Sequence, residues 1–166
     1  AAFSIAAIEE GIRHVMEFST GISKAAELMD TNVESAQQWS LAAKMNGKDV
    51  EYLAQTMLML GSTMDKAFGG DAKSIKAIES LGIEMDKLKD MSPEQALRAM
   101  AQNISSNGIS AEAGAAAYDI FGKKASKVLL ILSELKETEG MAVMSKTEIE
   151  DLRRANEEFE KMGTHL

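Results

Sequence analysis

Three observations predict an all-α protein. Residues that lose little conformational freedom in a helix, above all Ala, Met, Leu, Glu and Lys, are abundant, whereas the chain has a single proline and only 5% aromatic residues. Apolar residues recur at intervals of three and four along most of the sequence, as they do on one face of a helix. Glycines follow the ends of these stripes. We therefore expect a compact array of helices joined at glycine corners.

Length, charge and cysteine content exclude several classes of function. With 166 residues, the chain is long enough for one domain with a tail and too short for a large multidomain enzyme. Its net charge of −8 argues against binding the phosphate backbone, so we expect no specific nucleic-acid partner. The absence of cysteine excludes disulfides, thiolate metal sites and cysteine nucleophiles. No apolar run approaches the ~20 residues of a transmembrane helix.

The first 30 residues form one predicted amphipathic helix. We expect this helix to be able to project from the rest of the chain. Because the sequence enters helical periodicity at once, without a capping residue or an initiator Met, we interpret the chain as an excerpt or a processed product. The apolar stripe of this helix contains Ile5, Ile8, Ile12, Val15, Ile22, Ala26 and Met29.

Capping residues and glycines divide the remainder of the chain. Thr31 and Glu34 have the spacing of a capping box, which predicts a helix start. Asn46-Gly47 and Gly69-Gly70 are stop signals. We divide the chain into an N-terminal helix (1–30), a helical domain (31–139) and a charged C-terminal helix (140–166). The predicted helix boundaries lie near Asp30, Asn46, Gly69, Gly82, Ser92, Ser110 and Ser145.

Three short motifs are the strongest local signals. Leu81-Gly82 and Phe121-Gly122 each place a glycine directly after the last buried residue of a predicted helix, where a left-handed conformation reverses the chain. Ser92-Pro93-Glu94-Gln95 combines an N-cap serine, a proline at the first helical position and a glutamine that completes a capping box. We assign a structural role, the setting of helix ends and interhelix angles, to Leu81, Gly82, Ser92, Pro93, Glu94, Phe121 and Gly122.

The sequence predicts no catalytic, cofactor-binding or metal-binding residue. The two histidines, His14 and His165, lie at opposite ends of the chain without ligand spacing, so we interpret both as surface residues. Gly108, Gly114 and Gly122 do not have the spacing of a nucleotide-binding loop.

Glu79-Ser80 is the one candidate for catalysis. An acid followed by serine in a helical domain also occurs in lytic transglycosylases, but this chain has neither their downstream Gly-Leu-Met-Gln-type segment nor an aromatic-rich groove. A general acid also needs a second carboxylate or a water-positioning group nearby. We expect Glu79 to face solvent and to be dispensable for any chemistry.

Methionines and the single tryptophan could also bind a partner. Met57 and Met64 share a helical stripe with leucines, which predicts that they fill the core. Trp39 lies off the centre of the Ala-rich face of its helix. We expect Trp39 to be half buried, and an exposed anchor for a partner helix is the alternative.

Three stretches carry a resemblance to a known family. Residues 42–47 form an Ala-rich segment that ends in glycine, and residues 81–97 contain Leu-Gly-Ile followed by Leu-Lys-Asp-Met-Ser-Pro-Glu-Gln-Ala-Leu. Residues 115–123 end in Ile-Phe-Gly-Lys and precede the leucine-rich residues 128–132. In this order, over about residues 36–135, the stretches resemble the helical region of phage tail tape measure proteins.

The resemblance implies a structural role. It implies a non-enzymatic component of the virion tail, assembled in the bacterial cytoplasm, that helps to determine tail length and takes part in tail assembly and genome delivery. It also implies self-association and contacts with tail tube, tail tip and tail assembly chaperone proteins, and it implies no cofactor. The sequence differs from the family pattern at Ala125, where Gly is common, and at Leu130, where Pro is common.

Two other functions stay open. One is a peptidoglycan-cleaving tail domain similar to lytic transglycosylases, in which Glu79 would be the acid. The other is a helical adaptor unrelated to phages.

Overall fold

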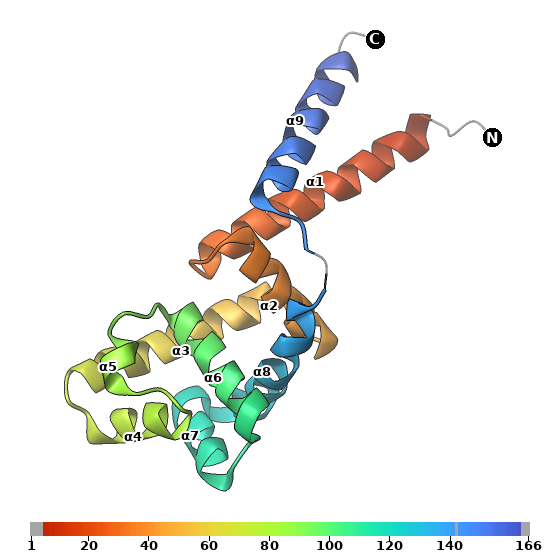
Figure 1. Ribbon diagram of the computed structural model, residues 1–166. Coiled ribbons are helices and arrows are strands. Elements are labelled where there is room, and N and C mark those ends of the chain that lie inside the picture. Colours follow the sequence, from red (N-terminus) through yellow and green to blue (C-terminus); the bar gives the residue numbers. More distant parts are fainter. Residues whose placement is uncertain (1–4, 142, 164–166) are drawn as a thin grey trace. The chain divides into compact units, whose positions relative to one another are not determined.

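A computed structural model describes residues 5–141 and 143–163, and for residues 5–9, 11, 12, 15 and 16 it describes the backbone only. Every regular element in these ranges is a helix (Figure 1), which confirms the all-α prediction. The chain divides into two compact units. One contains the residues up to Gln37 and those after Met141, and the other is Gln38–Met141. None of the described helices is long and apolar enough to cross a membrane.

The helices of the two units follow the chain in a simple order. The first unit contains α1 (Ile5–Leu28), the start of α2 (Val33–Met45) and α9 (Lys146–Gly163). The second unit contains the rest of α2 and then α3 (Val50–Phe68), α4 (Ala72–Ser80), α5 (Met85–Leu88), α6 (Pro93–Asn107), α7 (Ala111–Phe121), one turn of 3₁₀ helix η1 (Gly122–Lys124) and α8 (Ala125–Glu139).

In the first unit, α9 packs against α1 (Figure 1). The segment that enters α9 is also bonded to the start of α2. The Gln37 side chain accepts a hydrogen bond from Met144 N at 2.9 Å and donates one to Met144 O at 2.7 Å. Glu34 accepts a bond from Lys146 N at 3.0 Å. The terminal helices, which the sequence analysis treated as separate segments, therefore share one unit.

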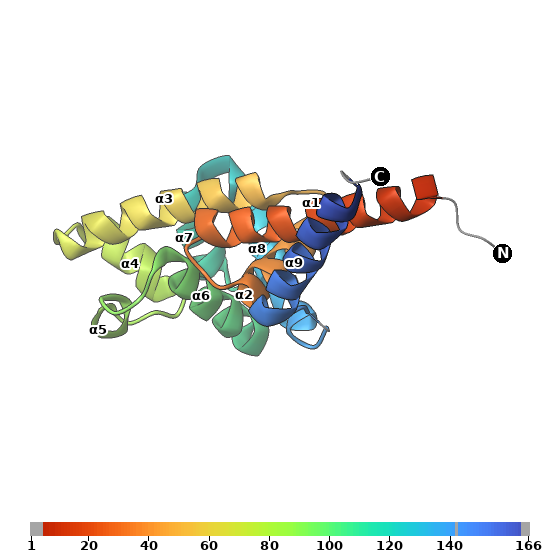
Figure 2. The ribbon, with the colours of Figure 1, turned by 90° about the horizontal axis from the view of Figure 1, so that it is seen from above.

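In the second unit, α3 runs across α4, α6 and α7 (Figure 2), and α6 and α7 both pack on α8. Met57 and Met64 are 5% and 4% exposed, which confirms that they fill the core. The largest fully buried side chains of this unit are Trp39, Phe121, Leu53, Leu60, Ile78, Leu81, Leu88, Leu97, Met100, Ile131, Leu132 and Leu135.

The predicted helix boundaries are confirmed to within a few residues, because local capping determines them. Asp49, Asp71, Ser92 and Ser110 each accept a hydrogen bond from the backbone N–H three residues later, as N-caps do. Ser145 likewise accepts a bond from Glu148 N at 3.1 Å.

The capping box predicted at Thr31 and Glu34 is wrong. Asn32 is the residue that accepts a hydrogen bond, from Ser35 N at 2.8 Å, and the Glu34 carboxylate is used by Lys146 N. Asparagine is at least as good an N-cap as threonine, and here it lies directly before the first helical residue.

Part of the N-terminal stripe lies outside the described side chains. This applies to Ile5, Ile8, Ile12 and Val15. Ile22, Ala26 and Met29, the remaining residues of the predicted stripe, are between 2% and 8% exposed, as the predicted stripe requires.

Candidate functional site

The motif residues of the sequence analysis lie together in the second unit, at the ends of its helices. Leu81 ends α4, Ser92 precedes α6, and Phe121 ends α7. These positions decide how the chain turns between helices. Their contacts show what each motif does.

The Leu81-Gly82 corner is fixed to α6. Leu81 is fully buried, and Gly82 has φ +94°, a left-handed conformation. A Cβ at Gly82 would lie 2.6 Å from Asn103 Nδ2 and 2.8 Å from Asn103 Cβ, which is closer than real side chains approach. Asn103 Nδ2 donates to Leu81 O at 3.2 Å. The glycine therefore allows a close contact through which an α6 side chain holds the end of α4.

The Ser92-Pro93 motif starts α6 as predicted. Ser92 Oγ accepts a hydrogen bond from Gln95 N at 3.2 Å, and Gln95 Oε1 accepts one from Ser92 N at 2.9 Å, which completes the capping box. Pro93 occupies the first helical position. A Cβ built at Gly61 of α3 would lie 3.4 Å from Pro93 Cγ, so α3 and α6 approach closely at this point. The motif sets both the start of α6 and its contact with α3.

Glu94 forms the centre of a buried polar cluster. Its carboxylate oxygen Oε1 accepts hydrogen bonds from Trp39 Nε1 at 2.8 Å and from Arg98 Nε at 3.2 Å. The Arg98 guanidinium carbon lies 5.5 Å from the centre of the Trp39 ring, within range of a cation–π interaction. Arg98 Nη1 also donates to Glu139 Oε1 at 3.3 Å. The cluster joins α2, α6 and the last turn of α8.

The burial of this cluster corrects the prediction for Trp39. We expected a half-buried ring, yet Trp39 is fully buried and its indole N–H is bonded to Glu94. The position of Trp39 on its helix did not predict this burial. The residue that binds its indole N–H, Glu94, lies 55 positions further along the chain. Trp39 is therefore not an exposed anchor in this structure.

The sequence analysis also did not predict that the cluster contains a buried carboxylate. Glu94 is 5% exposed, and a buried carboxylate requires compensation by a cation or by hydrogen bonds. The i,i+4 spacing of Glu94 and Arg98 was the available signal. Arg98 Nη2 is buried and has no acceptor among the described residues.

The Phe121-Gly122 corner carries a second polar contact. Phe121 is 1% exposed, and Gly122 has φ +59° and leads into η1. Next to it, the Tyr52 hydroxyl of α3 donates to Lys124 O at 3.4 Å, and Lys124 Nζ lies 5.1 Å from the Tyr52 ring centre. Burial raises the pKa of Tyr52 above its usual value, further from neutral pH. This corner is thus tied to α3.

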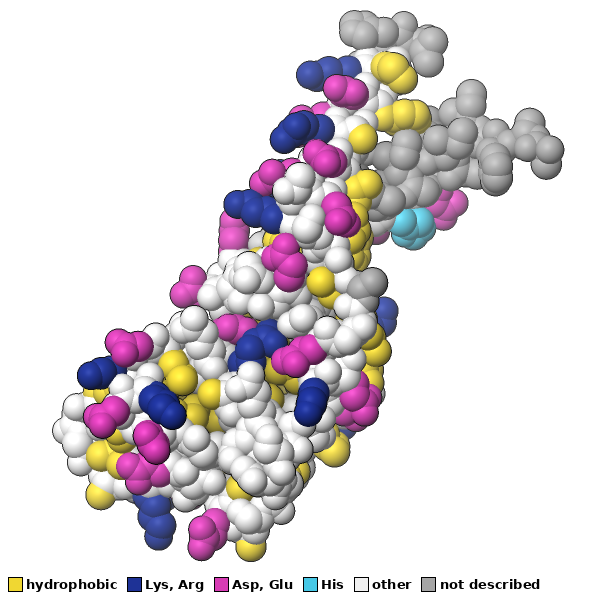
Figure 3. Space-filling view, in the orientation of Figure 1, with side chains coloured by type: hydrophobic (Ala, Val, Ile, Leu, Met, Phe, Trp, Pro, Cys, Tyr) yellow, Lys and Arg dark blue, Asp and Glu magenta, His cyan; other side chains and the backbone are white. Residues whose placement is uncertain are grey.

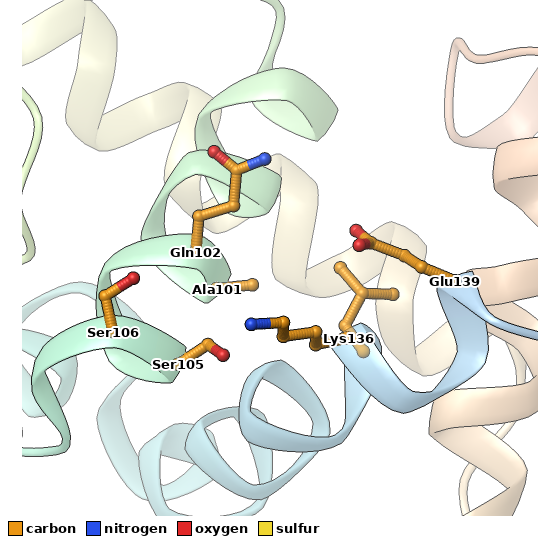
Figure 4. Close-up of a pocket in the computed structure, with 7 residues that line it drawn as sticks. Ala101, Gln102, Ser105, Ser106, Lys136 and Glu139 are labelled. Atoms are coloured by element: carbon orange, nitrogen blue, oxygen red, sulfur yellow. The ribbon is translucent and has the colours of Figure 1, made fainter.

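A small hollow lies between α6 and α8 (Figure 4). Its volume of about 180 Å³ is below the ~300 Å³ at which ligand pockets begin. Figure 4 shows the Lys136 side chain extending across it toward α6. The hollow is lined by Ala101, Gln102, Ser105, Ser106, Leu135, Lys136 and Glu139.

The remaining candidates for chemistry lie on the surface. Glu79 is exposed on α4, as expected. His14 has a 72% exposed side chain, 3.8 Å from Glu10, while His165 lies outside the described residues. Among the residues that the structure describes, no group of three His, Cys, Asp or Glu side chains could hold a metal ion. Lysines, arginines and carboxylates are interspersed on the face of the second unit that Figure 3 shows.

Comparison with known proteins does not assign the chain to a family. Protein-family models, curated proteins and solved structures yield no match.

Proposed function

We propose that this chain is a structural segment of a phage or prophage tail tape measure protein. In this role it acts through helix packing rather than catalysis, in the virion tail, during tail assembly, length determination and genome delivery. Its partners are further copies of itself and the tail tube, tail tip and tail assembly chaperone proteins.

The proposal rests on what the motif residues do in the structure. The residues that resemble the family hold helix ends and join helices: Gly82 admits Asn103, Ser92 caps α6, and Glu94 binds Trp39. Residues that fix helix ends and helix contacts maintain a fold, whereas catalytic residues place reactive groups in a cleft. This distinction supports a structural role over an enzymatic one.

The test uses phage particles induced from the source strain. Immunoblots with antibodies raised against the 166-residue chain should detect it in intact particles and should not detect it in particles that have ejected their DNA. Deleting the unit Gln38–Met141 in frame should shorten the tails seen by electron microscopy. Intact particles that lack the chain, or tails of unchanged length, would contradict the proposal.

A peptidoglycan assay distinguishes the enzymatic alternative from the structural proposal. We expect the purified chain not to clear a peptidoglycan gel. Clearing that Glu79→Gln abolishes, with unchanged circular dichroism, would replace the structural proposal with a peptidoglycan-cleaving one.

A further inference from the structure

Helix α1 carries exposed apolar side chains beside its buried stripe. His14, Phe18, Gly21, Ala25 and Leu28 recur at alternating intervals of four and three, so they lie along one side of the helix. Phe18 and Leu28 are 44% and 56% exposed, whereas Ala25 is covered. A helix with apolar side chains on two faces is typical of bundles rather than of isolated pairs.

The middle of this stripe has complementary shapes next to each other. Phe18 is a large exposed ring, and one turn further along Gly21 exposes bare backbone, with no atom within 4 Å of a Cβ built there. Small residues let helix backbones approach closely, and a large side chain of one helix can fill the space over a glycine of another. A second α1 in the opposite direction could therefore place its Phe18 over this Gly21, and the reverse.

The charges beside the stripe favour this antiparallel arrangement. Glu17 and Lys24 lie seven residues apart on the same side of α1, both are exposed, and neither forms an ion pair with a described residue. A two-fold axis near Thr20 would place each Glu17 opposite Lys24 of the second copy. A parallel pair in register would hold these residues at opposite edges of the interface, so no contact between Glu17 and Lys24 would form.

We propose that α1 is an antiparallel docking surface for α1 of a second copy of this chain, centred on Phe18 and Gly21. The contact is isologous, since the same patch serves both copies. The inference does not rest on the proposed phage function, because it uses only the shape and charge of α1.

Sedimentation of the full 166-residue chain over a range of concentrations tests the interface. The chain should form a reversible dimer, and Phe18→Ser should weaken it at least about tenfold in Kd. Leu58→Ser is the matched control, because Leu58 is 75% exposed on α3 in the other unit. Leu58→Ser should leave the dimer unchanged. Circular dichroism should show equal helicity for both variants.

Charge reversal then tests the direction of the helices. Glu17→Lys and Lys24→Glu should each weaken the dimer at least about fivefold at low salt, since each creates like-charge contacts twice in a symmetric pair. An equimolar mixture of the two variants should regain the original affinity as a heterodimer, because both contacts are then between opposite charges.

Other results would overturn the proposal. A chain that stays monomeric at all concentrations shows that α1 docks no second copy, and its stripe is then covered within the chain or by another protein. A dimer that Phe18→Ser leaves intact places the interface elsewhere. A dimer that the charge variants do not weaken, or that their mixture does not restore, excludes the antiparallel pairing.

Discussion

Gly82 and Gly122 both adopt positive φ, as the sequence predicted, but their surroundings differ. At Gly122 nothing lies within 4 Å of a built Cβ, so a side chain there meets backbone strain only. At Gly82 the same strain is joined by overlap with Asn103. An L-residue held in such a sparsely populated backbone conformation costs roughly 1–3 kcal/mol, and overlap in a packed site adds to this.

We predict that Gly82→Ala destabilises the chain more than Gly122→Ala. The second variant should cost about 1–3 kcal/mol of unfolding free energy, because Gly122 combines φ +59° with ψ −132°, and the first should exceed it by about 1 kcal/mol or more. Urea unfolding measures both. Gly114→Ala is the control, because Gly114 is helical with free space around it, and it should be neutral or slightly stabilising. Equal losses at the two corners would show that Asn103 simply moves aside.

Glu94 and Glu139 bind the same arginine from different environments. Glu94 is 6% exposed in its side chain and Glu139 is 40% exposed. Removing one partner of a buried ion pair leaves an uncompensated charge, whereas an exposed pair contributes little because water and salt screen it. Glu94 also accepts the Trp39 indole N–H, which would lose its only described acceptor.

We therefore predict that Glu94→Ala lowers the unfolding free energy by about 3 kcal/mol or more, and that Glu139→Ala lowers it by at most about 1 kcal/mol. Trp39 is the single tryptophan, so its fluorescence reports on this cluster directly. Its emission should change in Glu94→Ala and stay the same in Glu139→Ala. Similar stabilities for the two variants would mean that solvent enters the cluster.

The N-cap of α4 contains a carboxylate whose pKa is shifted by its hydrogen bonds. Hydrogen bonds from the Ser74 side chain and backbone hold the pKa of Asp71 below its usual value. A lowered folded-state pKa contributes stability that is present above the unfolded pKa and is lost as pH falls through the folded one.

We predict that Asp71→Asn makes stability less dependent on pH in the acid range. Asparagine is also a good N-cap, so the variant should be nearly as stable as the parent at pH 7. As the pH falls through the titration range of the Asp71 carboxyl group, the parent should lose the contribution of this carboxylate, and the variant should not. Urea midpoints measured at several pH values test this. Parallel pH curves for the two proteins would show that Asp71 titrates alike in both states.

Element boundaries were predictable because each depends on a few neighbouring residues. Asp49, Asp71, Ser92 and Ser110 act as caps whatever the helix later packs against. The helix α5 was not predicted, since its four residues are too few to show a period. The polar cluster at Glu94 was not predicted either, because its partners are brought together by packing and not by spacing along the chain.

At the scale of the whole molecule, the sequence predicted a helical domain over 31–139, and the structure has a compact unit at Gln38–Met141. Its core side chains come from every helix between α2 and α8, and α6 and α7 each contact both α3 and α8. Such a unit has the size and the closed core of an independently folding domain.

We predict that a fragment of residues 33–141, which keeps α2 intact, folds by itself. It should be helical and should melt in one cooperative transition, as small single domains do. Its Trp39 emission should equal that of the full chain, because the partners of Trp39, Glu94 and Arg98, are retained. The same fragment with Glu94→Ala should melt at a lower temperature, which ties the transition to the cluster. A fragment that is helical yet melts without a transition, or whose tryptophan emits as if in water, would show that residues outside 33–141 are needed to complete its core.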